Sequence, residues 1–105
     1  MSQSVTLEET AALLQKADHI LLLTHQYPDG DTIGSGYALC QALQSLGKTA
    51  RVACSDEIPG KYAYMTEPVP SPTFEPSFIC AVDVADAKLL GPRLEPYADR
   101  VDLAI

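Results

Sequence analysis

The chain has 105 residues, enough for one small domain, and a hydrophobic content of 47% allows a real core and argues against disorder. Fourteen acidic against seven basic residues give a formal charge of −7, so binding of long duplex DNA by phosphate neutralisation is disfavoured. No apolar run approaches the roughly 20 residues that span a bilayer, and the N-terminus lacks the basic and apolar regions of a signal peptide, which excludes a membrane role.

The first half of the chain alternates helical and extended patterns. A capping box at Thr6 to Glu9 and the apolar spacing behind it predict a helix over residues 7–17. The continuous apolar run at 20–24 predicts a strand that is buried on both faces, as in parallel sheets. Apolar residues at Ile33, Tyr37, Cys40, Leu43 and Leu46 then predict an amphipathic helix that ends at Gly47, and residues 49–54 predict a second strand.

The second half begins with a helical turn at 61–65, followed by four prolines between 68 and 76 that predict an ordered surface loop. Residues 78–82 predict a third strand, and a short helix then ends at Gly91-Pro92. Residues 93–98 predict a further short helical piece, and the alternation of Val101, Leu103 and Ile105 predicts a fourth strand over 100–105.

This order of elements predicts an α/β fold with a doubly wound, mainly parallel sheet and flanking helices. The last predicted strand is apolar and has no helix after it to cover it. We therefore expect residues 1–105 to be a truncated domain. The cysteines Cys40, Cys54 and Cys80 show no Cys-x-x-Cys spacing and lie in apolar stretches, which predicts buried free thiols in a reducing, cytoplasmic setting.

Chemistry-bearing residues follow the first predicted strand. His25, Asp29 and Asp31 lie where a strand gives way to a helix, the edge at which open α/β sheets bind ligands. Pro28-Asp29-Gly30 is also typical of a turn, and Asp31 or Thr32 can cap the helix without any metal. A histidine at the end of a buried strand has no capping purpose, and imidazole with carboxylates suits Mn²⁺ or a related divalent ion. The sequence leaves the metal site and the turn-and-cap interpretation both open.

Asp83 follows the third predicted strand and is the second candidate position. If that strand is parallel to 20–24, its end reaches the same edge of the sheet and Asp83 faces the first motif. The alternative is that Asp83 caps the next helix. Carboxylates that meet without compensation repel one another, and a bound dication relieves that repulsion. Asp86, one helical turn later, is better placed as a cap or as a partner of the ligands than as a ligand.

Other signatures are incomplete. Gly34-Ser35-Gly36 lacks the third glycine of a dinucleotide fingerprint, the lysine of a P-loop and the pattern of a nucleophile elbow. Gly34 and Gly36 instead let the start of the helix approach a neighbour or a phosphate closely, with Ser35 beside them. Tyr62 and Tyr64 are interpreted as packing residues, and stacking on a base stays open as the alternative.

The motif His25-Gln-Tyr-Pro-Asp29-Gly-Asp31, followed by Thr-Ile-Gly-Ser-Gly, resembles the first motif of the DHH phosphoesterase superfamily. Its form looks most like the bifunctional oligoribonuclease and PAP phosphatase (nanoRNase) branch, and Ala81-Val82-Asp83-Val84-Ala85-Asp86 resembles the second motif. The resemblance runs from about Leu7 to Ile105. It implies that residues 1–105 are part of the N-terminal domain, with its remainder and a C-terminal DHHA1 substrate domain absent.

The resemblance also implies a two-metal centre with Mn²⁺, for which Mg²⁺ or Co²⁺ can substitute. His25 and Asp29 would bind one ion, Asp31 the other, and Asp83 would bridge them. The implied reaction is hydrolysis of 3′-phosphoesters in very short oligoribonucleotides and in adenosine 3′,5′-bisphosphate. The Asp-His-His motif would come after Ile105, so we expect the fragment alone to be inactive or nearly so, while a homodimer of the full-length protein is compatible with this assignment.

Two alternatives stay open. A manganese-dependent inorganic pyrophosphatase of the same superfamily resembles the first motif as well. A non-catalytic nucleotide-binding or interaction module on the same sheet would need Asp29, Asp31 and Asp83 only as turn and cap residues.

Overall fold

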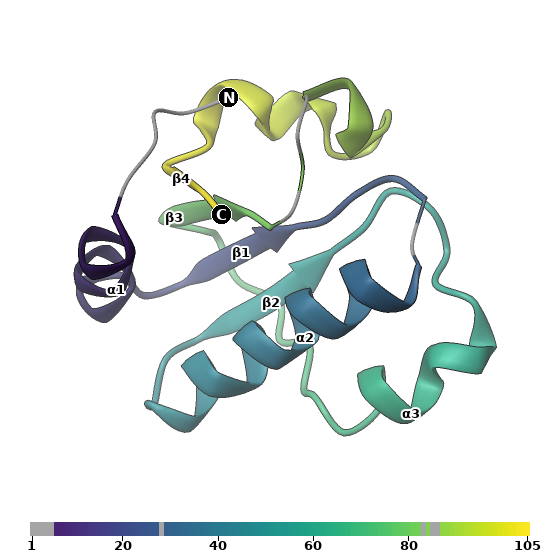
Figure 1. Ribbon diagram of the computed structural model, residues 1–105, viewed down its shortest axis with the longest axis horizontal. Coiled ribbons are helices and arrows are strands. Elements are labelled where there is room, and N and C mark those ends of the chain that lie inside the picture. The colour runs from purple at the N-terminus through teal and green to yellow at the C-terminus, as the bar shows by residue number, and fades with distance from the viewer. Residues whose placement is uncertain (1–5, 28, 83, 85–86) are drawn as a thin grey trace.

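A four-stranded sheet forms the centre of the computed structural model, which describes residues 6–27, 29–82, 84 and 87–105 (Figure 1). The strands are β1 (Ile20–Leu23), β2 (Ala50–Ala53), β3 (Phe78–Ala81) and β4 (Leu103–Ala104). All pairs are parallel, in the order β2-β1-β3-β4. The predicted α/β fold with a parallel sheet is therefore confirmed, and the winding direction reverses between β1 and β3, where such sheets open a crevice.

Helix α1 (Leu7–Lys16) carries the chain to the start of β1. Its predicted capping box is present, because the N–H of Glu9 donates to Thr6 Oγ1 at 3.0 Å and the N–H of Thr6 donates to Glu9 Oε1 at 3.2 Å. The Asp18 carboxylate then accepts hydrogen bonds from the N–H groups of His19 (2.7 Å) and Thr49 (2.8 Å). Asp18 thus joins the entrance of β1 to the entrance of β2.

One face of the sheet is covered by α2 (Gly30–Ser45), which packs on β1 and β2 (Figure 1). A Cβ on Gly36 would lie 3.0 Å from Thr24 Cγ2, so a glycine there lets the helix approach the strand closely. Gly47 takes a φ of +81° and ends the helix as predicted. Leu46, predicted as part of the buried face, is 68% exposed because the helix has already ended at Ser45.

The other face is covered by two 3₁₀ segments, η2 (Ala87–Leu90) and η3 (Glu95–Arg100). Short helical pieces were predicted in both places, and the structure makes them 3₁₀ turns. In Figure 1 they lie above the sheet while α2 and α3 lie below it, so the sheet has helical cover on both sides. The core on this second face consists of Leu21, Leu23, Ile79, Ala81, Val84, Leu90 and Leu94.

The predicted fourth strand is longer than the observed one. The strand is Leu103–Ala104, because Arg100 still belongs to η3. The N–H groups of Asp102 and Ile105 on either side of it also donate to β3, to Ile79 O at 2.8 Å and to Ala81 O at 2.9 Å. Val101 packs on the η3 side of the sheet and Leu103 on the α2 side, so the alternation that begins at Val101 does not belong to one strand face. Ile105 is 53% exposed.

The connection from β2 to β3 contains the predicted helical turn as η1 (Gly60–Tyr62) and α3 (Ala63–Thr66), followed by the proline-rich loop without regular structure. The loop is anchored by Gln44 Nε2, which donates to Pro70 O at 2.9 Å, and by Ser77 Oγ, which donates to Asp18 O at 2.7 Å. Tyr64 is 73% exposed, so its predicted packing role is wrong.

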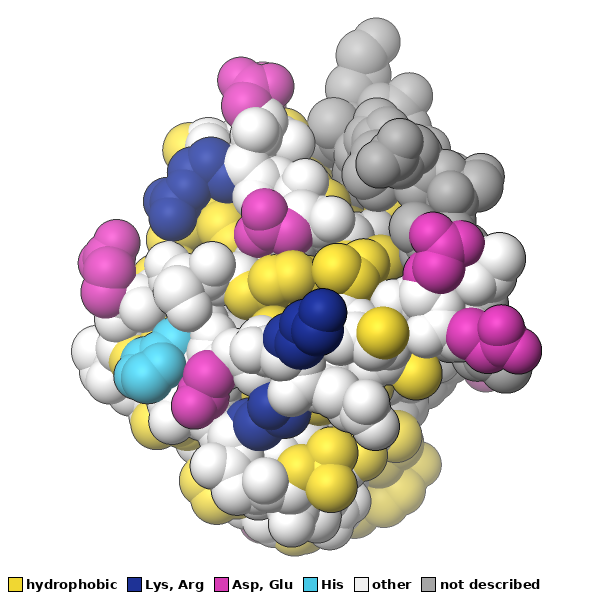
Figure 2. All heavy atoms as spheres, turned by 90° about the vertical axis from the view of Figure 1, so that its left-hand side faces the viewer, with side chains coloured by type: hydrophobic (Ala, Val, Ile, Leu, Met, Phe, Trp, Pro, Cys, Tyr) yellow, Lys and Arg dark blue, Asp and Glu magenta, His cyan; other side chains and the backbone are white. Residues whose placement is uncertain are grey.

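The surface carries mixed charge where it can be seen around α1. On the face drawn in Figure 2, acidic, basic and hydrophobic side chains are interspersed, so the negative net charge is not gathered there. None of the described helices is long and apolar enough to cross a membrane.

Candidate functional site

The carboxyl ends of β1 and β2 are locked together by Thr24. Its N–H and its Oγ1 both donate to Ala53 O, at 3.0 and 2.9 Å, and its side chain is fully buried. The loop that follows β1 therefore leaves the sheet from a fixed point, because Thr24, the first residue after the strand, is hydrogen-bonded to the end of β2 through its backbone and its side chain.

Three loops meet just beyond that point. The buried Ser55 hydroxyl donates to Leu90 O at 2.6 Å and accepts a hydrogen bond from the N–H of Leu94 at 3.2 Å. Gly91, with a φ of +81°, lies so close that a Cβ would be 2.7 Å from Ser55 Cβ and 2.9 Å from Gln26 Cγ. The segments after β1, β2 and β3 are thus joined into one rigid edge.

Sequence reasoning missed this junction. Gly91-Pro92 was interpreted only as the end of a short helix, and Ser55 carried no pattern of its own. The available signal was the glycine itself, since a buried glycine at positive φ marks a position where only the residue without a Cβ fits.

His25 is half-buried in the loop after β1 and already has local contacts. Its carbonyl accepts a hydrogen bond from the Cys54 thiol at 3.2 Å, and its Nδ1 accepts one from the N–H of Tyr27 at 3.0 Å. The centres of the His25 and Tyr27 rings lie 5.8 Å apart, and the planes of the two rings are inclined to each other by 49°. Because Nδ1 is the acceptor, the neutral imidazole in this arrangement carries its proton on Nε2.

Asp29 is the N-cap of α2, and its Oδ1 accepts a hydrogen bond from the N–H of Thr32 at 2.9 Å. The cap was predicted at Asp31 or Thr32, so its position is corrected. Hydrogen bonds from the N–H and the hydroxyl of Thr32 hold the pKa of Asp29 below its ordinary value, with smaller contributions from the N–H of Asp31 and the charge of His25. Asp29 is therefore ionised at neutral pH. The cap hydrogen bond from Thr32 N–H is accepted by Oδ1 and not by the second carboxylate oxygen, Oδ2.

The remaining site candidates on α2 are Asp31, Gly34 and Ser35. Asp31 and Ser35 are exposed in its first turns. A Cβ on Gly34 would meet Met65 Sδ at 3.9 Å, an ordinary contact, so the close approach predicted for this glycine pair belongs to Gly36. The amides at the start of α2 face the same region as the cap, where they favour an anion.

Asp83 and Asp86 lie outside the described residues. Up to Val82 the chain stays paired, since the N–H of Val82 donates to Leu23 O at 2.9 Å, so β1 and β3 end side by side. The prediction that Asp83 completes the site stays a prediction. Within the described ranges, no group of three or more His, Cys, Asp or Glu side chains is close enough to hold a metal ion.

The donor types at this edge fit a divalent metal, namely one imidazole and an ionised carboxylate on a short loop, with a second carboxylate on the helix that follows. A metal can bind to His25 only if one existing hydrogen bond of its ring is lost. Coordination through Nδ1 displaces the Tyr27 N–H, and coordination through Nε2 requires a proton on Nδ1, which removes the same hydrogen bond. Metal entry thus has to break the His25–Tyr27 contact.

Comparison with known proteins adds no relative. No protein-family model matches the chain, and no curated protein matches it significantly. The functional argument therefore rests on the motif residues and on their placement in the fold.

Proposed function

We propose that this chain carries part of a divalent-metal site for phosphoester hydrolysis of the DHH phosphoesterase type. The observation that carries the proposal is the position of His25 and Asp29 on one loop at the point where the winding of the sheet reverses. Open α/β sheets bind their ligands at that point. The rigid junction around Gly91 supports a metal site at the same edge of the sheet, because such a site needs ligands that are held in place.

The residues that would hold the ions are His25, Asp29 and Asp31, with Asp83, which follows β3 in the sequence. Bound there, Mn²⁺ (or Mg²⁺ or Co²⁺) would supply a water of lowered pKa and would neutralise phosphate charge. Asp29 needs no deprotonation before binding a cation, because its pKa is already held low by Thr32. The amides at the start of α2 would orient a substrate phosphate at the same edge.

The proposed substrates are very short oligoribonucleotides and adenosine 3′,5′-bisphosphate, cleaved at the 3′-phosphoester. The motif resemblance supports this class, and the negative net charge favours a small substrate over a long duplex. The cysteines Cys40, Cys54 and Cys80 are all free thiols, which supports the proposal that the protein works in the reducing cytoplasm. Cys54 is only half-buried, so the expectation that all three thiols are buried is corrected there.

A second candidate is a non-catalytic nucleotide-binding module. The observation that favours it is that both central side chains have structural tasks, His25 Nδ1 as acceptor for the N–H of Tyr27 and Asp29 Oδ1 as cap for Thr32. In such a module neither residue needs a metal.

Calorimetric titration of the metal-free protein with Mn²⁺ separates the two candidates. We expect saturable binding that is lost in His25→Ala. The matched control is His19→Asn, which changes the other histidine at the opposite end of β1. Asparagine tolerates the φ of +50° found at His19. Equal heats for wild type and His25→Ala would support the non-catalytic module, and no heat at all would end the metal proposal.

Hydrolysis assays with added Mn²⁺, made on the full-length protein that the motif resemblance implies, then distinguish the substrate classes. Release of mononucleotides from a diribonucleotide, or of phosphate from adenosine 3′,5′-bisphosphate, would support the proposed activity. Turnover of inorganic pyrophosphate instead would support the manganese-dependent pyrophosphatase.

A further inference from the structure

A surface cavity of about 300 Å³ lies between α2 and α3, which Figure 1 shows side by side below the sheet. It is lined by the start of the proline-rich loop at 68–69 and by six residues of the two helices: Gly34, Tyr37, Ala38, Gln41, Tyr64 and Met65. None of the lining residues carries a charge, although charged residues make up 20% of the chain. The lining therefore suits an uncharged ligand.

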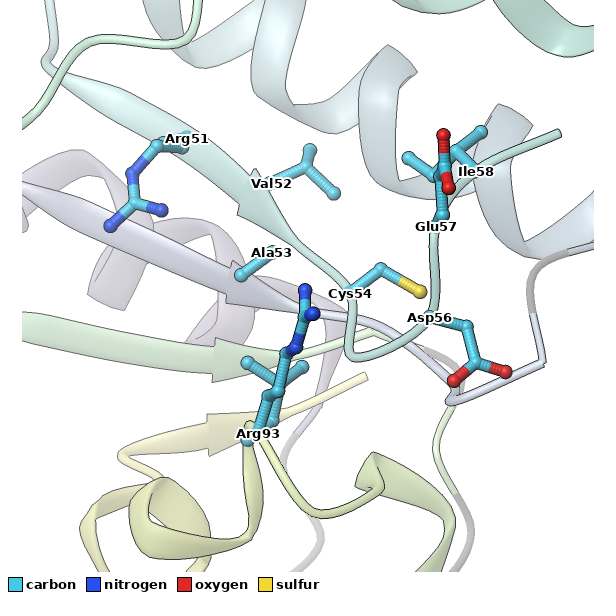
Figure 3. A pocket seen from close by; sticks show the side chains of 9 residues that line it. Arg51, Val52, Ala53, Cys54, Asp56, Glu57, Ile58 and Arg93 are labelled. Carbon is cyan, nitrogen blue, oxygen red and sulfur yellow. The ribbon is translucent and has the colours of Figure 1, made fainter. Parts of the chain in front are cut away.

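The larger cavity, of about 550 Å³ over β2, has a different character (Figure 3). Arg51, Arg93, Asp56 and Glu57 all line it, so charges of both signs meet there and favour no single class of ligand. Cys54 also lines it and is hydrogen-bonded to His25 O, so this cavity adjoins the candidate metal site. The cavity between α2 and α3 is the one whose lining indicates what it binds.

Aromatic and sulfur-containing side chains form its walls. Tyr64 is 73% exposed and offers a ring that the protein itself leaves uncovered. Tyr37 is half-buried and packs on the α2-side core, which fixes that wall. A Cβ on Gly34 would lie 3.9 Å from Met65 Sδ, so the thioether covers the helix where a side chain is missing. Tyrosine rings and methionine sulfur both attract a flat aromatic ligand.

Gln41 adds one polar group to this lining. It is exposed, and its backbone carbonyl accepts a hydrogen bond from Ser45 Oγ at 2.9 Å. Within the described residues its side-chain amide has no partner, so one donor group and one acceptor are free for a ligand. An uncharged pocket with aromatic walls and a single amide fits a nucleobase.

The cavity lies along α2 from the proposed metal edge. Asp31, Gly34, Ala38 and Gln41 follow one another at steps of three, four and three residues, which places them on one stripe of the helix. With a rise of 1.5 Å per residue, Gly34 and Ala38 lie about 5 and 10 Å along the axis from Asp31. A nucleotide whose phosphate lies at Asp31 can therefore place its base in the cavity.

We propose that this cavity binds an adenine base, with Tyr64 stacked on the face of the ring and Gln41 hydrogen-bonded to its edge. The amide of glutamine matches the amino group and N7 of adenine. The uncharged lining disfavours a phosphate, which stays at the edge of the sheet. The assignment rests on the proposed function in one respect, namely that the base belongs to the nucleotide whose phosphate the metal site holds.

The test is a titration of the metal-free protein, in EDTA, with adenosine, which has no phosphate. In ¹H–¹⁵N spectra we expect saturable shifts that are largest at Gly34, Ala38 and Gln41. Tyr64→Ala should weaken adenosine binding about fivefold to a hundredfold, the loss of one stacked base. Tyr64→Phe keeps the ring and should bind within about twofold of wild type. Because Tyr64 is exposed, neither substitution endangers folding.

Filling the cavity gives an independent variant with a matched control. Ala38 and Ala42 are both exposed on α2, one turn apart, and only Ala38 lines the cavity. Leucine is a good helix former, so both replacements keep the helix. Ala38→Leu should abolish adenosine binding, and Ala42→Leu should bind adenosine as wild type does.

The role of Gln41 is tested with purine riboside, which lacks the amino group of adenosine. Wild type should bind adenosine about fivefold or more tighter than purine riboside. Gln41→Met keeps the length of the side chain without its amide and should bind the two nucleosides alike. Equal binding of both nucleosides by wild type would overturn the assignment of Gln41.

The site itself is overturned if wild type shows no saturable shifts, if the shifts gather away from α2 and α3, or if Tyr64→Ala binds adenosine as wild type does. Since the probe has no phosphate and the solution no metal, a failed Mn²⁺ titration leaves this result readable. Adenosine binding without Mn²⁺ binding would support the base pocket and favour the non-catalytic nucleotide-binding module over the phosphoesterase.

Discussion

Asp29 and Thr32 are joined by a hydrogen bond of 2.9 Å from the backbone N–H of Thr32 to Asp29 Oδ1. The contact gives Asp29 a structural task at the start of α2 in addition to its proposed task as a metal ligand. An alanine at this position would remove both at once. A substitution that keeps the cap and removes the charge separates the two tasks.

Asp29→Ser is that substitution, because serine caps helices about as well as aspartate. We expect Asp29→Ser to melt close to the wild-type temperature and Asp29→Ala to melt clearly lower, while both lose Mn²⁺ binding. Thermal unfolding followed by circular dichroism, together with calorimetric Mn²⁺ titration, measures the two effects. Retention of Mn²⁺ affinity in Asp29→Ser would show that Asp29 is a cap and not a ligand.

Asp18 should make stability depend on pH in the acid range. Hydrogen bonds from the N–H groups of Thr49 and His19 hold the pKa of Asp18 below its ordinary value of 3.8. A carboxyl whose pKa is lowered by folding contributes stability above its unfolded pKa, and this is lost as pH falls through the folded pKa. Asp18→Asn should therefore be less stable than wild type at neutral pH, with a smaller difference at about pH 2.

Urea denaturation midpoints at several values between about pH 7 and pH 2 check this expectation. Asp99→Asn serves as the control, because Asp99 is an exposed carboxylate in η3. Parallel pH profiles for wild type and Asp18→Asn would contradict the role assigned to Asp18.

The elements that could be predicted are those whose signals are local. The capping box at Thr6 and the apolar run of β1 depend on residues a few positions apart, and both are confirmed. The α2 boundary was less well placed, because Asp29, Asp31 and Thr32 are all suitable caps and only the path of the loop selects one. The predicted start of the fourth strand was wrong for a different reason. Val101 and Leu103 alternate regularly in the sequence, but the chain up to Arg100 is still in η3.

The parallel pairing of β1 with β3 could be expected from the order of elements, but contacts between loop residues that are distant in sequence could not be predicted. Nothing near Ser55 indicates that it reaches Leu90, because the distance between them is set by how three loops pack. The same holds for the cavity shared by Arg51 and Arg93, which come from a strand and a remote turn. Sequence motifs gave one imidazole and three carboxylates as candidates for the site, Asp83 lying outside the described residues, but did not show that the His25 ring is already hydrogen-bonded to Tyr27.

The three thiols should differ strongly in reactivity. Burial raises the pKa of Cys80 to about 12 and also raises the pKa of Cys40, and both side chains are inaccessible. Cys54 is half-buried and should be the first to react with iodoacetamide in the native protein. Mass spectrometry after timed labelling should show one modification, at Cys54, and three only after unfolding. Early labelling of Cys80 would mean that the β3 core opens locally.

Gly91→Ala should be strongly destabilising, and Gly47→Ala is its matched control. Both glycines have a φ of +81°, but a Cβ on Gly47 would meet nothing within 4 Å, whereas a Cβ on Gly91 would lie 2.7 Å from Ser55 Cβ. Gly47→Ala should therefore cost only the left-handed backbone strain of about 1–2 kcal/mol. Gly91→Ala adds overpacking at the loop junction, for a total of about 2–5 kcal/mol.

Free energies of unfolding from urea titration measure both variants. Gly91→Ala should also weaken Mn²⁺ binding, because the overpacked Cβ pushes Ser55 and Gln26 apart and loosens the loop that carries His25. Gly47 lies at the far end of α2, so its variant should bind Mn²⁺ as wild type does. Equal losses of stability in the two variants would show that the junction yields to the extra methyl group, and that the rigidity assigned to this edge of the sheet is absent.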